Sequence, residues 1–122
     1  FELMKTRVLV TGGSGFIGTN LIDYYKDQYE VLNLDIAKPR NESHLDFWKN
    51  GDILDEEKIV GIFNDFQPHY VFHMAARTDL DGKMLPDYSA NTIGVENIIS
   101  AINQTKSIEN LLRLQFQEFY DV

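Results

Sequence analysis

The chain has 122 residues, a formal net charge of −8 and no cysteine. The acidic balance argues against nucleic acid or an anionic membrane as the main partner, and the lack of cysteine excludes disulfides, thiol nucleophiles and thiolate metal sites. With 43% hydrophobic residues, no signal peptide and no apolar run of about 18–20 residues, we expect one cytoplasmic domain. Because the first methionine is Met4, we read residues 1–3 as a cloning remnant, 4–106 as the domain and 107–122 as a tail.

The chain opens with a strand, a glycine-rich loop and a helix. Residues 8–10 are apolar, as expected for a strand buried on both faces. The glycines that follow fit G-x-G-x-x-G from Gly13 and G-x-x-G-x-x-G from Gly12, both ending at Gly18. Such glycines permit a tight turn, let the backbone approach a phosphate and let the helix pack close to the sheet. The helix that follows is expected to bury one face, formed by Ile17, Leu21, Tyr24 and Tyr25.

The second apolar strand, residues 31–34, ends in the acid Asp35. A carboxylate at this place can accept hydrogen bonds from the adenosine ribose of NAD, and its charge would repel the 2′-phosphate of NADP. Arg40 lies close enough downstream to weaken that preference. Taken alone, Asp35 is more typical of a strand-end or turn acid, but the strand, glycine loop, helix and strand in this order favour the ribose role.

Strands and helices continue to alternate along the chain. Residues 37–44 indicate a loop and residues 45–49 a short strand. The next helix begins with acidic residues 55–57 and ends at Gln67-Pro68, and its expected buried stripe is Ile59, Ile62, Phe63 and Phe66. Another strand covers residues 70–72, and the last clear helix begins near Pro86 and faces the sheet with Val95, Ile98, Ile99 and Ile102. The tail fits a strand or a helix, with a slight preference for a strand. This alternation predicts an α/β fold with a doubly wound parallel sheet.

Four motifs resemble, in the same order, the N-terminal part of the extended short-chain dehydrogenase/reductase family, which contains NAD-dependent nucleotide-sugar epimerases and dehydratases. They are the loop TGGSGFIG at 11–18, GDI at 51–53, HMAA at 73–76 and NTIGVEN at 91–97. The resemblance implies a Rossmann-like sheet, truncated after about the fourth or fifth strand. It also implies an NAD site formed by Gly12, Gly15, Phe16, Ile17, Gly18, Asp35, Asp52, Ile53, Ala75, Ala76 and Asn91.

Within this resemblance, Asp52 and Ile53 flank the adenine, and the stretch with Ala75 and Ala76 runs beneath the nicotinamide. Each residue also has a plainer interpretation: Asp52 alone more often caps a turn, and small residues such as Ala75 and Ala76 also serve tight packing. Asn91 falls on the apolar stripe of its helix. Because a lone polar group there is costly unless paired, we expect its amide to bond neighbouring backbone and steady the site floor.

The sequence predicts neither a metal site nor a catalytic residue. The spacing of His69 and His73 suits a helical metal pair, but in a strand it separates them by roughly 13 Å, so we predict no metal site. Family members carry a catalytic Y-x-x-x-K motif, and no tyrosine of this chain is followed four positions later by lysine, so we assign no catalytic residue.

Two functions follow from the sequence. The first is the NAD-binding portion of an epimerase or dehydratase that acts on a nucleotide sugar as a full-length enzyme. The second is a naturally short, non-catalytic dinucleotide-binding or interaction module. A sheet that ends near the fourth or fifth strand would leave an apolar edge, to be covered by the tail or by self-association into a homo-oligomer.

Overall fold

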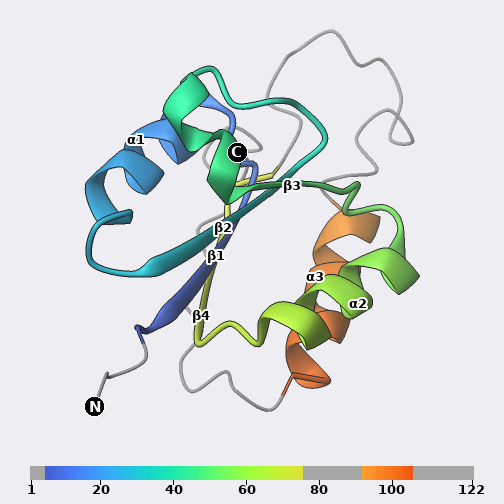
Figure 1. Ribbon diagram of the computed structural model, residues 1–122. Coiled ribbons are helices and arrows are strands. Elements are labelled where there is room, and N and C mark those ends of the chain that lie inside the picture. The colour runs from blue at the N-terminus through green and yellow to red at the C-terminus, as the bar shows by residue number, and fades with distance from the viewer. Residues whose placement is uncertain (1–4, 76–91, 106–122) are drawn as a thin grey trace, which may run out of the picture.

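The computed structural model describes residues 5–75 and 92–105, which form a parallel four-stranded sheet with helices on both faces (Figure 1). The strands are β1 (Arg7–Thr11), β2 (Glu30–Asp35), β3 (Trp48–Asn50) and β4 (Tyr70–His73), in the spatial order β3-β2-β1-β4. The predicted Rossmann-like parallel sheet is therefore confirmed. In the described part of the chain, no helix is long and apolar enough to cross a membrane.

The helices are α1 (Phe16–Tyr25), η1 (a 3-10 helix, Glu42–Phe47), α2 (Glu56–Phe66) and α3 (Ile93–Asn103). The predicted limits of α2 are confirmed. Its first turn is capped by the Asp55 side chain, which accepts a hydrogen bond from Lys58 N at 3.2 Å. Its last turn ends at Gln67 in a left-handed conformation with a φ of 53°, immediately before Pro68.

Two apolar clusters hold the layers together, one on each face of the sheet. Consecutive side chains of a strand point to opposite faces, so Leu9 of β1 packs with α2 and α3 while its neighbours Val8 and Val10 pack with Ile22 of α1. The predicted α2 stripe is confirmed, with Ile59, Ile62 and Phe63 buried and Phe66 packed at the margin.

The buried face of α1 differs from the predicted one. Leu21 packs against the core as predicted, and Tyr25 is half-buried and stacks on Phe72. Gly18 and Ile22 are the fully buried residues, however, whereas Tyr24 is 70% exposed and Ile17 is 39% exposed. The reason is the close approach of Gly18 to the glycine loop, where an added Cβ would lie 2.5 Å from Gly12 O. This contact sets the rotation of the helix, so apolar residues away from the Gly18 side remain at the surface.

The α3 face was also predicted incorrectly in part. Ile98 is buried as expected, but Ile99 is 37% exposed, and Gly94, Asn97 and Ala101 take the remaining buried positions. Gly94 decides this face because it lies directly against the Ile53 side chain. The expected beginning of this helix near Pro86 lies outside the described residues.

The expected strand at 45–49 instead covers Trp48–Asn50, because the residues before it form η1. Asn41 caps η1, and its side chain accepts a hydrogen bond from Ser43 N at 2.9 Å. This local bond favours a helical turn where apolar content alone suggested a strand. The tail at 107–122 lies outside the described residues.

Candidate functional site

The glycine loop joins the end of β1 to the beginning of α1, and its glycines serve different purposes. Gly12 has a φ of +71°, and an added Cβ would lie 2.7 Å from Ala75 N; at Gly18 it would lie 2.5 Å from Gly13 Cα. At Gly15, in contrast, the nearest atom to an added Cβ would be Gly12 O at 3.5 Å. Gly12 and Gly18 are therefore required by the packing of the chain itself, whereas Gly15 is not.

Helix α1 begins at the residue directly after Gly15. Gly15 is its N-cap and supplies no side-chain cap, and the first turn contains no acidic residue. Thr19 N makes the first helical hydrogen bond, to Gly15 O at 2.8 Å. The N–H groups of Phe16, Ile17 and Gly18 precede that bond, and together with the helix dipole they favour an anion here.

Asp35 lies at the carboxyl end of β2, beside the glycine loop. Its Oδ2 accepts a hydrogen bond from Ser14 N at 3.0 Å, and its Oδ1 accepts one from Ala37 N at 3.0 Å. Its backbone carbonyl accepts hydrogen bonds from Trp48 Nε1 at 2.9 Å and Gly51 N at 3.3 Å. A carboxylate has about four acceptor positions, so each oxygen of Asp35 can still accept from a ligand hydroxyl.

Thr11 ties the end of β1 to the end of β4. Its Oγ1 accepts hydrogen bonds from Met74 N at 3.0 Å and Ala75 N at 3.1 Å. Since a hydroxyl has two acceptor positions and one proton, that proton is left for His73 Nδ1, 2.7 Å away. The tight packing considered for Ala75 is thus present against Gly12, and Ala76 lies outside the described residues.

The turn after β3 is held from α3. Asp52 is exposed and its Oδ1 accepts a hydrogen bond from Leu54 N at 3.0 Å, which is the turn role considered for it. The Ile53 side chain is buried against Gly94, and its carbonyl accepts a hydrogen bond from Asn97 Nδ2 at 2.8 Å. The buried amide that steadies this turn is therefore the side chain of Asn97. The sequence analysis did not assign Asn97, although its position about one helical turn after Gly94 places both residues on the same face of α3.

Asn91, for which that role was predicted, lies outside the described residues. Asn97 belongs to the same NTIGVEN motif.

Ser14 and Asn33 form a second polar contact that sequence reasoning did not assign. Ser14 is only 4% exposed, and its Oγ donates to Ala37 O at 2.7 Å and accepts from Asn33 Nδ2 at 3.0 Å. Asn33 is a polar residue inside an otherwise apolar strand, which was the available signal. Together these contacts connect the middle of β2, the glycine loop and the segment after Asp35.

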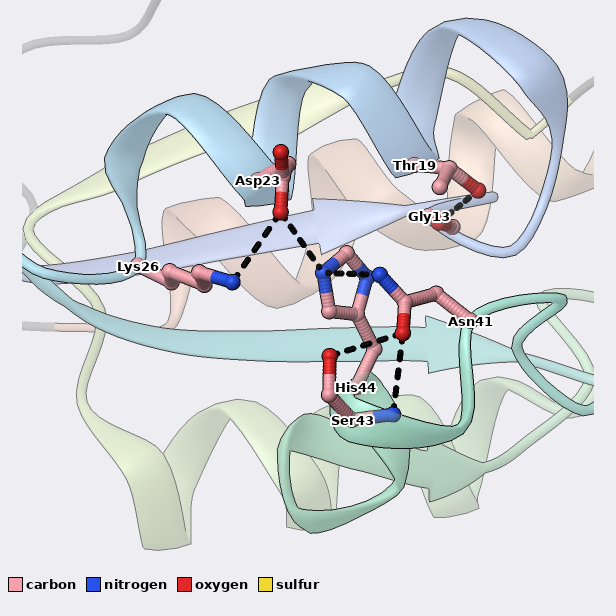
Figure 2. Close-up of polar contacts among 7 residues, drawn as sticks. All are labelled: Gly13, Thr19, Asp23, Lys26, Asn41, Ser43 and His44. Atoms are coloured by element: carbon pink, nitrogen blue, oxygen red, sulfur yellow. Dashed lines mark hydrogen bonds and ion pairs between the residues drawn. The ribbon is translucent and has the colours of Figure 1, made fainter.

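The segment after Asp35 is also tied to α1, as Figure 2 shows. The buried His44 of η1 places Nε2 3.4 Å from Asp23 Oδ1 and 3.4 Å from Asn41 Nδ2. Lys26 donates to the same Asp23 oxygen at 3.0 Å, and this bond, followed by the one to His44, lowers the pKa of Asp23. At the other end of α1, the Thr19 hydroxyl points to Gly13 O at 3.5 Å.

The two histidines considered as a metal pair contact different residues. His69 Nδ1 accepts a hydrogen bond from Arg7 N at 3.0 Å, whereas His73 contacts Thr11. Across residues 5–75 and 92–105, no group of three or more histidine, aspartate or glutamate side chains could hold a metal ion.

Two curated proteins that are similar to this chain are named as enzymes of nucleotide sugars. UDP-glucose 4-epimerase of Mycoplasma genitalium is 32% identical in an alignment of 111 residues that covers 81% of this chain and 32% of that protein. A probable dTDP-glucose 4,6-dehydratase of Sinorhizobium fredii is 39% identical in an alignment of 85 residues that covers 62% of this chain and 24% of that protein. The chain thus spans about a third or less of the length of these curated relatives.

Two solved structures that contain NAD are also similar to this chain. The Bordetella bronchiseptica enzyme WbmG, crystallised with NAD, superposes with a TM-score of 0.78 at 28% identity, covering 89% of this chain and 37% of that one. UDP-glucose 4-epimerase of Thermus thermophilus, also with NAD, gives a TM-score of 0.74 at 31% identity, covering 87% of this chain and 36% of that one. The family model for the NAD dependent epimerase/dehydratase family matches residues 8–120. The chain belongs to the NAD dependent epimerase/dehydratase family.

Proposed function

We propose that this chain binds NAD and forms the cofactor-binding part of an epimerase or dehydratase that acts on a nucleotide sugar. The observation that carries the proposal is the contrast within the glycine loop. Gly12 and Gly18 are glycines because neighbouring backbone leaves no room for a Cβ, but among the described residues Gly15 faces no such neighbour. A glycine that internal packing does not need, at the N-terminus of an uncapped helix, suits the close approach of a ligand phosphate.

The other site residues fit the parts of a dinucleotide. In the proposal, the N–H groups at the beginning of α1 receive the pyrophosphate, and the free acceptor positions of Asp35 receive the adenosine ribose hydroxyls. Asp52 and Ile53 would flank the adenine, and the stretch that includes Ala75 would run beneath the nicotinamide end. Ala76, in the same stretch, and Asn91, as a support of the site floor, are also assigned to the site, although both are outside the described residues. Because Ile53 is 6% exposed, it would support the adenine mainly through its backbone and through the turn that Asn97 holds.

Bound NAD would supply hydride acceptance, and in most such enzymes the hydride returns to the sugar. The residues described here would bind and orient the cofactor. Since no tyrosine of the chain precedes a lysine by four positions, we place the proton-transfer pair and most sugar contacts outside this chain. A cytoplasmic location and self-association through a sheet edge remain predictions, to be checked by cell fractionation and by sedimentation.

Isothermal titration calorimetry with NAD and NADP tests the proposal. We expect the chain to bind NAD with a dissociation constant in the micromolar range or weaker, because it spans only part of its relatives, and to bind NADP more weakly still. Asp35→Ala should lose NAD affinity and reduce the difference between the two ligands. Asp65→Ala is the control. It removes a side chain of the same charge from α2, which lies on the face of the sheet opposite α1, and it should bind NAD and NADP with wild-type affinity. Failure of a folded sample to bind either dinucleotide would refute the proposal.

A further inference from the structure

An amide side chain is buried in the middle of β2, between Leu32 and Leu34. Asn33 is 0% exposed, and its Oδ1 has no hydrogen-bond partner among the described residues. A buried acceptor without a partner lowers stability compared with an apolar side chain of similar shape. Packing of the sheet therefore gives no reason for asparagine at this position.

The other half of the amide contacts the glycine loop. Asn33 Nδ2 donates to Ser14 Oγ at 3.0 Å. The Ser14 hydroxyl proton is used toward Ala37 O at 2.7 Å, so its oxygen can only accept from Asn33, and this fixes the orientation of the amide. Ser14 is thereby held from two sides, by β2 and by the segment that follows β2.

Asn33 also determines how closely the loop lies on the sheet. A Cβ added to Gly13 would lie 2.4 Å from Asn33 Oδ1, so the amide packs directly against the loop backbone. It therefore contacts the two consecutive loop residues 13 and 14, one by packing and one by a hydrogen bond. The second of these, Ser14, donates its backbone N–H to Asp35 Oδ2 at 3.0 Å.

We propose that Asn33 is a positioning residue for dinucleotide specificity: through Ser14 it holds the Asp35 carboxylate in place for the adenosine ribose. This inference rests on the proposed function. Asp35 recognises the ribose only if its oxygens keep a fixed direction, and Ser14 N–H is one of the two backbone donors that fix them. Without the amide, Ser14 loses a donor and the loop loses its support, so Asp35 would discriminate less well between NAD and NADP.

The first test compares Asn33→Ala with Val31→Ala. Val31 lies two residues earlier on the same face of β2 and is 5% exposed, so its truncation also leaves a cavity beneath α1. We expect Asn33→Ala to weaken NAD binding about tenfold, equivalent to about 1.4 kcal/mol. We also expect it to lower the ratio of the NADP dissociation constant to the NAD dissociation constant. Val31→Ala should lower stability but leave that ratio unchanged. Equal ratios in the two variants would overturn the proposal.

A double-mutant cycle tests whether Asn33 acts through Asp35. In an Asp35→Ala background, adding Asn33→Ala should leave NAD affinity unchanged, because coupled residues are not additive. A further tenfold loss of NAD affinity in that background would mean that Asn33 acts by a route other than Asp35, and would overturn the proposal. Asn33→Leu, which removes both polar atoms at similar volume, serves if the alanine variant does not fold, and should narrow the ratio in the same way.

Hydrogen exchange of the ligand-free protein separates this inference from the proposed function. The Ser14 amide should exchange faster in Asn33→Ala than in wild type, whereas the Leu9 amide of β1 should not change. If wild type bound neither dinucleotide, the proposed function and the specificity role would both fail. If wild type bound NAD and Ser14 exchange were unaffected, only the positioning role would fail.

Discussion

Gly15→Ala is the substitution that most directly separates binding from folding in this chain. Gly15 has a φ of −77° and a ψ of −179°, an extended conformation that alanine adopts freely. Among the described residues other than its two chain neighbours, the nearest atom to the added methyl would be Gly12 O, at 3.5 Å. The remaining cost is that alanine is a poorer N-cap than glycine, by about 1 kcal/mol or less.

The effect on NAD binding should be larger than the effect on stability. The methyl would occupy the place where the phosphate approaches the backbone, and would displace it from at least one N–H donor. A hydrogen bond to a charged group is worth about 1.5–3 kcal/mol. We therefore expect a 10- to 100-fold rise in the dissociation constant, since about 1.4 kcal/mol corresponds to a factor of ten.

Gly18→Ala is the matched comparison, because its Cβ would lie 2.5 Å from both Gly12 O and Gly13 Cα. Backbone atoms cannot move aside cheaply, so we expect a loss of stability of at least about 2 kcal/mol despite the better helix propensity of alanine. Urea unfolding followed by circular dichroism measures stability, and calorimetry measures NAD affinity. Wild-type NAD affinity in Gly15→Ala would refute the assignment of the phosphate to this position. Greater destabilisation by Gly15→Ala than by Gly18→Ala would refute the packing argument.

Three further substitutions test the contacts around the site. Asn97→Leu should lower the free energy of unfolding by about 1–3 kcal/mol, because it leaves the buried Ile53 carbonyl unpaired; a value near zero in urea unfolding would contradict this. Gly94→Ala should destabilise because its Cβ would lie 2.4 Å from Ile53 Cδ1 and 2.8 Å from Ile53 Cγ1, and it should cost less stability in an Ile53→Ala background, where both atoms are removed; simple additivity of the two changes would count against the clash. Lys26→Met should raise the pKa of Asp23 toward its ordinary value of 3.8, as followed by NMR of the carboxyl carbon. The stability that the lowered Asp23 pKa provides is fully present above pH 3.8 and is lost as the pH falls through the pKa of Asp23 in the folded protein. If Asp23 titrated identically in Lys26→Met and in wild type, the ion pair would be refuted.

The helices show which features can be predicted from local sequence patterns and which cannot. The stripe and ends of α2 were predictable because its spacing, its Asp55 cap and the Gln67-Pro68 stop all act within the segment itself. For α1 the same method selected Tyr24, which is exposed. The rotation of α1 depends instead on the approach of Gly18 to the glycine loop, which apolar spacing does not encode.

The candidate site divides in the same way. The glycine spacing and the acid at the end of β2 could be recognised because both lie within one contiguous strand, loop, helix and strand unit. Asn33, Ser14 and Asn97 could not be assigned, because a polar residue inside an apolar segment indicates only that it needs a partner. The partner is chosen by the fold.

By itself, the sequence determined the order of strands and helices, the parallel sheet and the place of the glycine loop and Asp35. These depend on periodicity and backbone freedom, which act over a few residues. The tertiary structure decided which distant groups meet: Ser14 with Asp35 across 21 residues, Asn97 with the Ile53 carbonyl across 44, and Ala75 with Thr11 across 64. Those contacts arise only when the carboxyl ends of neighbouring parallel strands are brought to one edge of the sheet, and that edge is where a dinucleotide would bind.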